Sequence, residues 1–455
     1  MTLLDVVKWV IGLGAAVFLP IVMMLMGMLF GLRPGKAIRA GLTLGVAFTG
    51  INLVVGQLLV GQVAPAAQAM INRLGLHLTA MDVGWPAAST ISWAWPYAAI
   101  MFPVQIVLNL LLLLVGWTRT LNVDLWNVWQ KVFAGAVVMG VTGSLTWAFI
   151  VAIAMIVIEL KIGDITAKRV QKLTGVPGIS IPHACATWLL PVAPFAMLLD
   201  AIPGMKKLRA NPEDIQRKIG FFGENIIIGL IMGLLIGILA GYKVDKILQL
   251  GVTVAATMVL LPRMASIFME ALMPISEAAS EFMKKRLSGR EFYIGLDWPI
   301  LAGHPSTIVS AVLLIPVLVL LSVTLPGNKV LPFGDLGNFG CLMGPVVAIV
   351  GGDLVRSLIL GVVVLAVSLW GATKVAPAFT ELAIQVGQQI PEGATQISWL
   401  KTSPVIWGTL EFAEVNWIGI ILSVAFLVAG FWILKTRYSD LPEAEEAEAA
   451  GGKAS

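Results

Sequence analysis

The sequence predicts an all-α polytopic membrane protein of about 11 transmembrane helices, arranged as two inverted repeats followed by a C-terminal helix. Three observations lead to this prediction. Of the 455 residues, 58% are hydrophobic and only 12% are charged, against roughly 25% charged residues in a soluble domain. Apolar runs of about 20 residues, the length that crosses a bilayer, recur along most of the chain. The second half of the chain also repeats landmarks of the first half in the same order.

The apolar runs account for the predicted spans. The long runs are residues 8–30, 41–63, 95–116, 132–160, 226–241, 247–272, 300–325, 354–371 and 415–434. Residues 178–202 and 337–352 are shorter or interrupted by proline. We expect no cleavable signal peptide, because the first run is long and lacks a small-residue cleavage site. Residues 439–455, SDLPEAEEAEAAGGKAS, are acidic without an apolar face and predict a disordered tail.

Charge and cysteine content argue against several classes of protein. The formal net charge of +4 is small and spread out, so a nucleic-acid-binding surface is not expected. No GxxxxGK[ST] motif occurs, which argues against a nucleotide-binding P-loop. Cys185 and Cys341 both lie in apolar surroundings. We therefore expect neither a disulfide framework nor a metal cluster, and no cofactor.

The internal repeat is visible in three matched landmarks. GLRPGKAIRAG at 31–41 matches GYKVDKILQLG at 241–251, and the Trp-Pro pair at 85–86 matches that at 298–299. DLWN at 124–127 matches DLGN at 335–338. A colinear series of this kind predicts repeats over residues 1–205 and 206–390. Residues 391–438 then form a C-terminal segment with the last transmembrane helix.

The distribution of basic residues predicts that the repeats are inverted. Three basic residues in the loop at 31–40 place it in the cytoplasm by the positive-inside rule. Residues 284–290 carry four basic residues, whereas the corresponding first-repeat segment, 64–92, carries only Arg73. A basic cluster at 161–172 disagrees with a simple count of five spans. A re-entrant hairpin within residues 132–160 would resolve that disagreement.

Two segments with broken hydrophobicity are the candidate site. They are MDVGWPAASTISWAWP at 81–96 and GLDWPILAGHPST at 295–307. In inverted-repeat transporters the substrate lies near the bilayer midplane, where broken helices release backbone and side-chain polar groups. We predict a catalytic role for Asp297, because a carboxylate beside a membrane segment is costly without a function. Predicted substrate-binding residues are Asp82, Trp85, Ser89, Thr90, His183, Trp298, His304, Ser306 and Thr307.

Each of these residue types also has a structural interpretation. The Ser-Thr pairs can be helix N-caps instead of ligands for hydroxyl groups. Trp85 and Trp298 can belong to an interfacial aromatic belt, or can stack on the C–H face of a sugar or polyol. His183, in the sequence IPH, can be a buried histidine bonded only to the backbone. These alternatives remain open from the sequence.

Several longer motifs carry a family resemblance. They are IQRKIGFFGE (215–224), GLIMGLLIGILAGY (229–242), VLPFGDL (330–336), NVDLWNVW (122–129), DVGWP (82–86) and IPH (181–183). In these the sequence resembles the galactitol-type EIIC membrane component of the phosphoenolpyruvate-dependent sugar phosphotransferase system (PTS). The resemblance implies a homodimer in which each subunit has a V-shaped scaffold and a mobile core with re-entrant hairpins. The scaffold would comprise residues 1–80 and 206–290, and the core residues 81–205 and 291–390.

The resemblance also implies a function. The chain would carry galactitol or a related polyol or sugar inward across the bacterial inner membrane, by an elevator-type movement. Separate EIIA and EIIB proteins would supply the phosphoryl group from a phosphorylated cysteine of EIIB. Asp297, with His183 or His304, would accept the hydroxyl proton. Two other classes stay open: an ion-coupled secondary transporter of a small polar solute, with Asp297 as the ion site, and an integral membrane enzyme.

Overall fold

The computed structural model describes residues 15–73, 78–93, 95–122, 127–205, 225–286, 292–332, 335, 338–385, 396–414 and 416–439. The predicted tail beyond residue 439 lies outside these residues. The helices of the first half are α2 (Ala15–Leu29), α3 (Pro34–Leu53), η1 (Val54–Val63), α4 (Ala64–Arg73), α5 (Gly84–Trp93), η2 (Ala98–Ile100), α6 (Met101–Leu114), α7 (Val128–Thr142), α8 (Leu145–Thr174), η3 (Ala184–Trp188) and α9 (Leu189–Ala201). Those of the second half are α11 (Asn225–Leu239), α12 (Val244–Arg286), α13 (Pro299–Ala302), α14 (Pro305–Thr324), α15 (Gly340–Ile349), α16 (Leu354–Gln385), α17 (Pro404–Ala413) and α18 (Trp417–Arg437).

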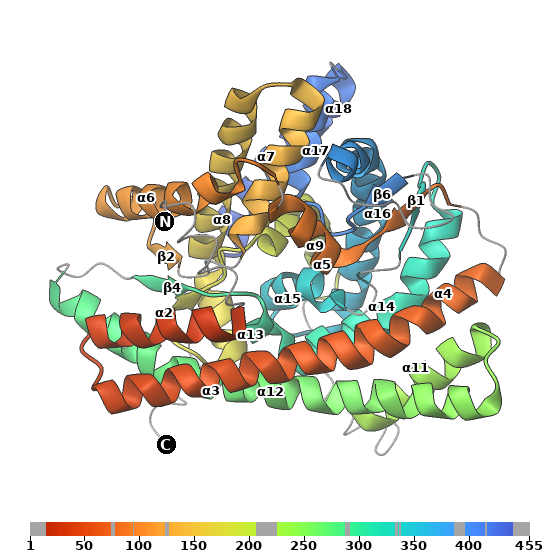
Figure 1. Cartoon of the computed structure of the whole chain (residues 1–455), viewed down its shortest axis with the longest axis horizontal. Helices are drawn as coiled ribbons and strands as arrows, with labels where there is room; N and C mark the ends of the chain where they lie inside the picture. The colour runs from red at the N-terminus through yellow and green to blue at the C-terminus, as the bar shows by residue number, and fades with distance from the viewer. Residues whose placement is uncertain are drawn as a thin grey trace.

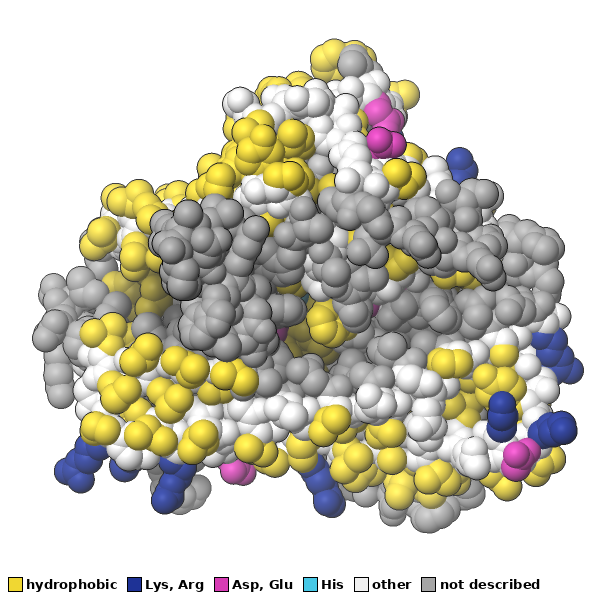
Figure 2. Space-filling model, in the orientation of Figure 1, with side chains coloured by type: hydrophobic (Ala, Val, Ile, Leu, Met, Phe, Trp, Pro, Cys, Tyr) yellow, Lys and Arg dark blue, Asp and Glu magenta, His cyan; other side chains and the backbone are white. Residues whose placement is uncertain are grey.

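Five helices in the described part of the chain are long and apolar enough to cross a membrane. They are Leu145–Thr174, Ala184–Ala201, Pro305–Thr324, Leu354–Gln385 and Trp417–Arg437. Hydrophobic side chains form several patches on the face shown in Figure 2, and basic side chains project along its lower edge. Such an apolar exterior suits a lipid environment, where helices satisfy their backbone groups internally. The predicted polytopic membrane class is therefore confirmed.

One layer of the molecule consists of α2, the continuous run α3–η1–α4, α11 and α12. These helices lie along the lower part of Figure 1, where α12 packs against α3 and α11, and α3 packs against α2. The loops α2–α3 and α11–α12 both turn at a glycine with positive φ, Gly31 and Gly241. The repeated glycines Gly41 and Gly251 lie where helices approach closely. A Cβ on Gly41 would come within 2.9 Å of the Pro20 carbonyl oxygen, and one on Gly251 within 2.9 Å of Leu230.

The second layer contains the remaining helices, shown above the first layer in Figure 1. Residues 132–160 do not form one span. They belong to two helices, α7 and α8, which pack against each other and are joined by a turn at Gly143 with φ +66°. Ser144 caps α8 by accepting a hydrogen bond from the Trp147 N–H.

Short parallel strands within the second layer were not expected from the sequence. In one sheet β1 (Ala80–Asp82) lies between β5 (Val330–Leu331) and β6 (Gln396–Ser398). In the other sheet β4 (Tyr293–Gly295) lies between β2 (Thr120–Asn122) and β3 (Ile179–Ser180). The fold is thus mostly helical rather than purely α. Strands of two or three residues satisfy the backbone where helices break, and they are too short to show an alternating pattern.

Candidate functional site

The strands position the candidate site, because in β1, β3, β4 and β6 a polar residue lies at the end of the strand or within three residues after it. Asp297 and Trp298 follow β4, and His183 follows β3. Asp82 ends β1, and Lys401 follows β6. Parallel strands direct their carboxyl ends to the same edge of a sheet, so residues far apart in sequence meet there.

The first cluster is the pair His183 and Asp297, which the sequence had placed in one site. Nε2 of His183 lies 3.5 Å from Oδ1 of Asp297, and both side chains are buried. Nδ1 of His183 accepts the backbone N–H of Cys185 at 3.0 Å. The neutral ring therefore carries its proton on Nε2, the nitrogen that faces Asp297. Oδ1 of Asp297 also accepts the Trp298 backbone N–H at 2.7 Å, which fixes the orientation of the carboxylate.

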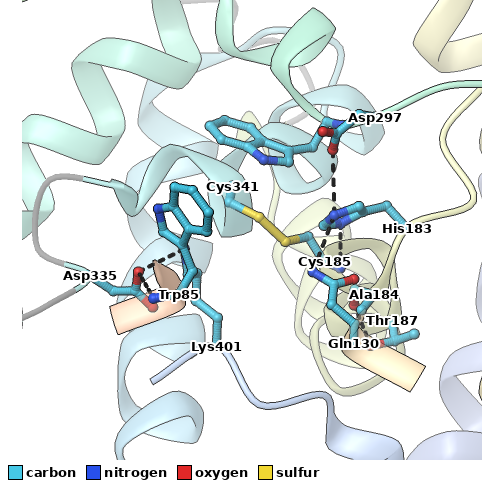
Figure 3. The surroundings of a disulfide bond; sticks show 11 residues. Trp85, Gln130, His183, Ala184, Cys185, Thr187, Asp297, Asp335, Cys341 and Lys401 are labelled. Carbon is cyan, nitrogen blue, oxygen red and sulfur yellow. Dashed lines mark hydrogen bonds and ion pairs between the residues drawn. A yellow bond between two sulfur atoms is a disulfide. The ribbon is translucent and has the colours of Figure 1, made fainter. Parts of the chain in front are cut away.

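Gln130 on α7 completes the surroundings of the histidine. Its Nε2 lies 3.3 Å from Nε2 of His183, a contact between two donors when the ring proton is on Nε2, and its side chain is almost fully buried. Figure 3 shows Gln130 and Asp297 on either side of the His183 ring. One imidazole thus has a carboxylate and an amide within reach. This arrangement suits recognition of a hydroxyl group, which both donates and accepts hydrogen bonds.

A disulfide joins Cys185 to Cys341, so the expectation that these cysteines are unpaired is wrong. The two Cα atoms are 6.1 Å apart across 156 residues of sequence. The bond connects η3 to α15 and lies beside His183 (Figure 3). Donor atoms of His183, Cys185 and Cys341 lie within 4.8 Å of one another. Both sulfurs are used in the disulfide, however, and the metal ligand is a thiolate, so we assign no metal to this group.

The second cluster surrounds Asp335 and is also buried. Oδ1 of Asp335 accepts the Trp85 backbone N–H at 3.1 Å and lies 3.0 Å from Nζ of Lys401. With the amide of Asn338 turned so that its oxygen faces these donors, it accepts hydrogen bonds from Trp85 Nε1 at 3.2 Å and from Lys401 Nζ at 2.8 Å. In the view of Figure 3 this cluster and the His183–Asp297 pair lie on opposite sides of the disulfide.

Asp82 joins three chain segments through backbone contacts. Its Oδ1 accepts the N–H groups of Gly84 at 3.3 Å and Leu400 at 3.0 Å, and its Oδ2 accepts the Asp335 N–H at 2.8 Å. The carboxylate therefore fixes β1 to the residues that present Asp335 and Lys401. In these contacts Asp82 holds the backbone segments of the site together.

The predicted residues at the start of α14 divide into two groups. His304 caps the helix by accepting the Ser306 N–H at 3.2 Å, and Ser306 donates its hydroxyl to the Gly352 carbonyl at 2.6 Å. Ser306 thereby connects the start of α14 to the turn at Gly352. Thr307 instead lies near Gly340, as does the indole of Trp298: a Cβ on Gly340 would meet Trp298 at 3.7 Å and Thr307 at 3.9 Å.

The matching pair on α5 is only partly described. Ser89 is buried in this helix. The side chain of Thr90 lies outside the part of the chain that the structure describes.

Two buried polar atoms near these clusters are notable. Within the described residues, neither Oγ1 of Thr307 nor Oδ2 of Asp335 has a hydrogen-bond partner. Burying such an atom unpaired costs about 1–3 kcal/mol. A bound molecule rich in hydroxyl groups would provide the missing partners.

Sequence reasoning missed Gln130, Asn338 and Lys401. Gln130 lies beside Lys131 just before the apolar run at 132–160, where polar residues next to a membrane segment are a signal that could have been noticed. Lys401 is a charged residue in the apolar, tryptophan-containing stretch SWLKTSPVIW, a comparable signal. Its connection to Asp335 depends on strand pairing across the chain, which composition does not reveal.

Comparison with known proteins is consistent with this chemistry. Residues 9–393 match the family described as the sugar-specific permease component of the PTS system, EIIC-GAT. The chain is 37% identical over 435 residues to the galactitol-specific EIIC component of the PTS in Escherichia coli (strain K12), covering 94% of this chain and 95% of that one. The same values hold for the galactitol-specific EIIC component of Escherichia coli O157:H7.

The chain belongs to the EIIC-GAT permease family. The resemblance seen in the sequence motifs is thereby confirmed over nearly the whole chain. As a member of this family it is an integral protein of the inner membrane and a sugar or polyol permease component of the PTS. The structure adds that the sequence-predicted residues Asp297 and His183 are in contact.

Proposed function

We propose that this EIIC-GAT chain binds galactitol or a related polyol or sugar and carries it inward, coupled to phosphorylation by a separate EIIB. The observation that supports this most directly is the buried pair Asp297 and His183, 3.5 Å apart, with Trp298 next to Asp297 in the chain. A polyol offers hydroxyl donors to the carboxylate and C–H groups to the ring. The identity of the relatives, named as galactitol-specific, supports the same substrate class.

The proposed chemistry uses Asp297 as the proton acceptor. A substrate hydroxyl oxygen attacks the phosphorus of phosphocysteine on EIIB, so that a P–O bond forms and the P–S bond breaks. The hydroxyl proton passes to the carboxylate of Asp297, and the cysteine leaves as a thiolate. His183 orients the hydroxyl from Nε2 while its Nδ1 is held by the backbone. The phosphoryl group is carried by EIIB, and EIIA in turn supplies EIIB.

The proposed architecture is an elevator built from two inverted repeats in a homodimer. Residues 1–80 and 206–290 form the scaffold, residues 81–205 and 291–390 the moving core, and residues 391–438 the C-terminal segment. The similar hairpins α2–α3 and α11–α12, each with a turn glycine of positive φ, support the repeats. The clustering of both hairpins in one layer, with the polar clusters in the other, supports the division into scaffold and core.

Uptake into vesicles tests the proposed function. Vesicles containing the chain receive EIIA, EIIB, phosphoenolpyruvate and labelled galactitol, and the product is identified. We expect the label to accumulate as a phosphate ester and only when phosphoenolpyruvate is present. Unmodified galactitol that accumulates with an ion gradient, and is lost when that gradient collapses, would instead establish an ion-coupled secondary transporter.

A further inference from the structure

The two short sheets correspond to each other residue by residue. Ala80 pairs with Val330 in one sheet, and Tyr293 pairs with Thr120 in the other. The third strands agree as well. Asp82 pairs with Ser398 in one sheet, and Gly295 pairs with Ser180 in the other. Each central strand thus lies between two strands from the opposite half of the chain, and Ser398 occupies the position of Ser180.

This register makes Lys401 the positional counterpart of His183. His183 lies three residues after Ser180 and precedes η3, and Lys401 lies three residues after Ser398 and shortly precedes α17. Each residue faces an aspartate, at 3.5 Å for His183 and Asp297 and at 3.0 Å for Lys401 and Asp335.

The parallel extends to the two Trp-Pro pairs. The backbone N–H of Trp298 donates to Asp297, and that of Trp85 donates to Asp335. Each aspartate is therefore held by the tryptophan of one pair and faces a basic residue. The two clusters thus have the same arrangement, but the group that faces the aspartate is a titratable imidazole in one and an ammonium group in the other.

A single short segment connects the two clusters. Asn338 contacts Trp85 and Lys401, and two residues later a Cβ on Gly340 would lie 3.7 Å from Trp298. Cys341 is bonded to Cys185, which is two residues from His183. Asn338 and Cys341 are three residues apart, which is less than one turn of a helix, so one short stretch of the chain contacts both clusters.

We propose that Asp335, Lys401 and Asn338 form a second half of the polyol site, which binds the hydroxyl groups at the end remote from Asp297. The proposal rests on the proposed polyol-binding function. Oδ2 of Asp335 is buried and, within the described residues, lacks a donor, which a terminal hydroxyl provides. Only an acyclic polyol long enough to reach from Asp297 to Asp335 gains both sets of contacts. The site therefore selects alditols by chain length.

Binding of alditols of increasing length tests this proposal. Dissociation constants for glycerol, erythritol, xylitol and galactitol are measured by calorimetry on the purified full chain. The test variant is Asp335→Asn/Lys401→Met, which removes both charges together and so leaves no uncompensated buried ion. A second variant, Lys401→Arg, keeps the charge but adds bulk at the same position. The control is Lys374→Met/Glu411→Gln, a pair with a 3.1 Å contact outside either cluster.

For the double variant we expect galactitol affinity to fall about 10- to 100-fold, the loss of one or two hydrogen bonds to charged groups, with erythritol unchanged within about twofold. Lys401→Arg should also weaken the binding of galactitol more than that of erythritol. This variant tests the second half-site if the double variant does not fold. The control variant should retain the wild-type dependence of affinity on alditol chain length.

If the double variant loses affinity equally for alditols of all lengths, or loses none for galactitol, the second half-site is overturned. The proposed polyol-binding function is unaffected by that outcome. A wild-type chain that binds none of the alditols overturns the proposed function, and this inference with it.

Discussion

Replacing Asp297 by asparagine separates the two functions proposed for this carboxylate. Asparagine keeps the size of the side chain and a carbonyl oxygen that can accept the Trp298 N–H, a contact of 2.7 Å in the structure. It removes the charge that faces Nε2 of His183 at 3.5 Å and the capacity to take a proton. Binding and phosphorylation should therefore respond to different extents.

The expected magnitudes follow from these contacts. Exchanging a charge-assisted for a neutral hydrogen bond to a substrate hydroxyl costs roughly 1–1.5 kcal/mol, or about 5- to 15-fold in affinity for galactitol. Loss of a general base lowers the rate of phosphoryl transfer by about 10²- to 10⁴-fold. Asp297→Asn should thus retain measurable galactitol binding while formation of the phosphate ester nearly stops.

The assay compares calorimetric binding with phosphoenolpyruvate-dependent formation of phosphate ester in the same vesicle preparation. Asp200→Asn is the matched control, since Asp200 is partly buried and paired with Arg356 at 3.2 Å outside both polar clusters. That variant should transfer phosphate at nearly the wild-type rate. Phosphorylation by Asp297→Asn at the wild-type rate would refute a base function and leave Asp297 with binding alone.

Three further predictions concern topology, partner docking and the disulfide. Cysteines placed at the exposed positions Lys36 and Asp245 should label from opposite sides of the membrane, and labelling from one side contradicts inverted repeats. Charge reversal at residues 284–290 should slow phosphorylation in a salt-dependent way and spare polyol binding, because it weakens the electrostatic steering of phosphorylated EIIB. Equal loss of phosphorylation and polyol binding, or no effect on either, argues against docking of EIIB at these residues. Replacing Cys185 and Cys341 by serine should lower the midpoint of thermal unfolding. Chain entropy for a 156-residue loop predicts a loss of up to about 5 kcal/mol in the free energy of unfolding. An unchanged midpoint contradicts the pairing.

The membrane class and part of the site could be predicted from the sequence. Apolar runs identify membrane helices because lipid imposes one composition on every span. Asp297 and His183 could be selected because polar groups are scarce in this chain, and the structure brings them together. Such reasoning finds residues whose presence is unusual in their own segment.

The rest of the site depends on contacts between distant segments. Lys401 pairs with Asp335 only because β6 adds to β1 beside β5, and no local pattern reports that pairing. The disulfide was missed for a similar reason, since the apolar surroundings of Cys185 and Cys341 gave no sign that η3 and α15 meet. His304 is the opposite case, in which a conspicuous residue proves to cap a helix.

The exchange of strands between the two halves of the chain also has a consequence for synthesis. β1 ends at residue 82, but its partners β5 and β6 begin at residues 330 and 396. At about 5–20 residues per second, the ribosome needs roughly 15–60 s after making β1 to produce β6. During this interval the polar backbone of β1 and the carboxylate of Asp82 must be accommodated without their final partners. A nascent first half therefore has no complete sheet, and we expect it to depend on the insertion machinery until the second half emerges.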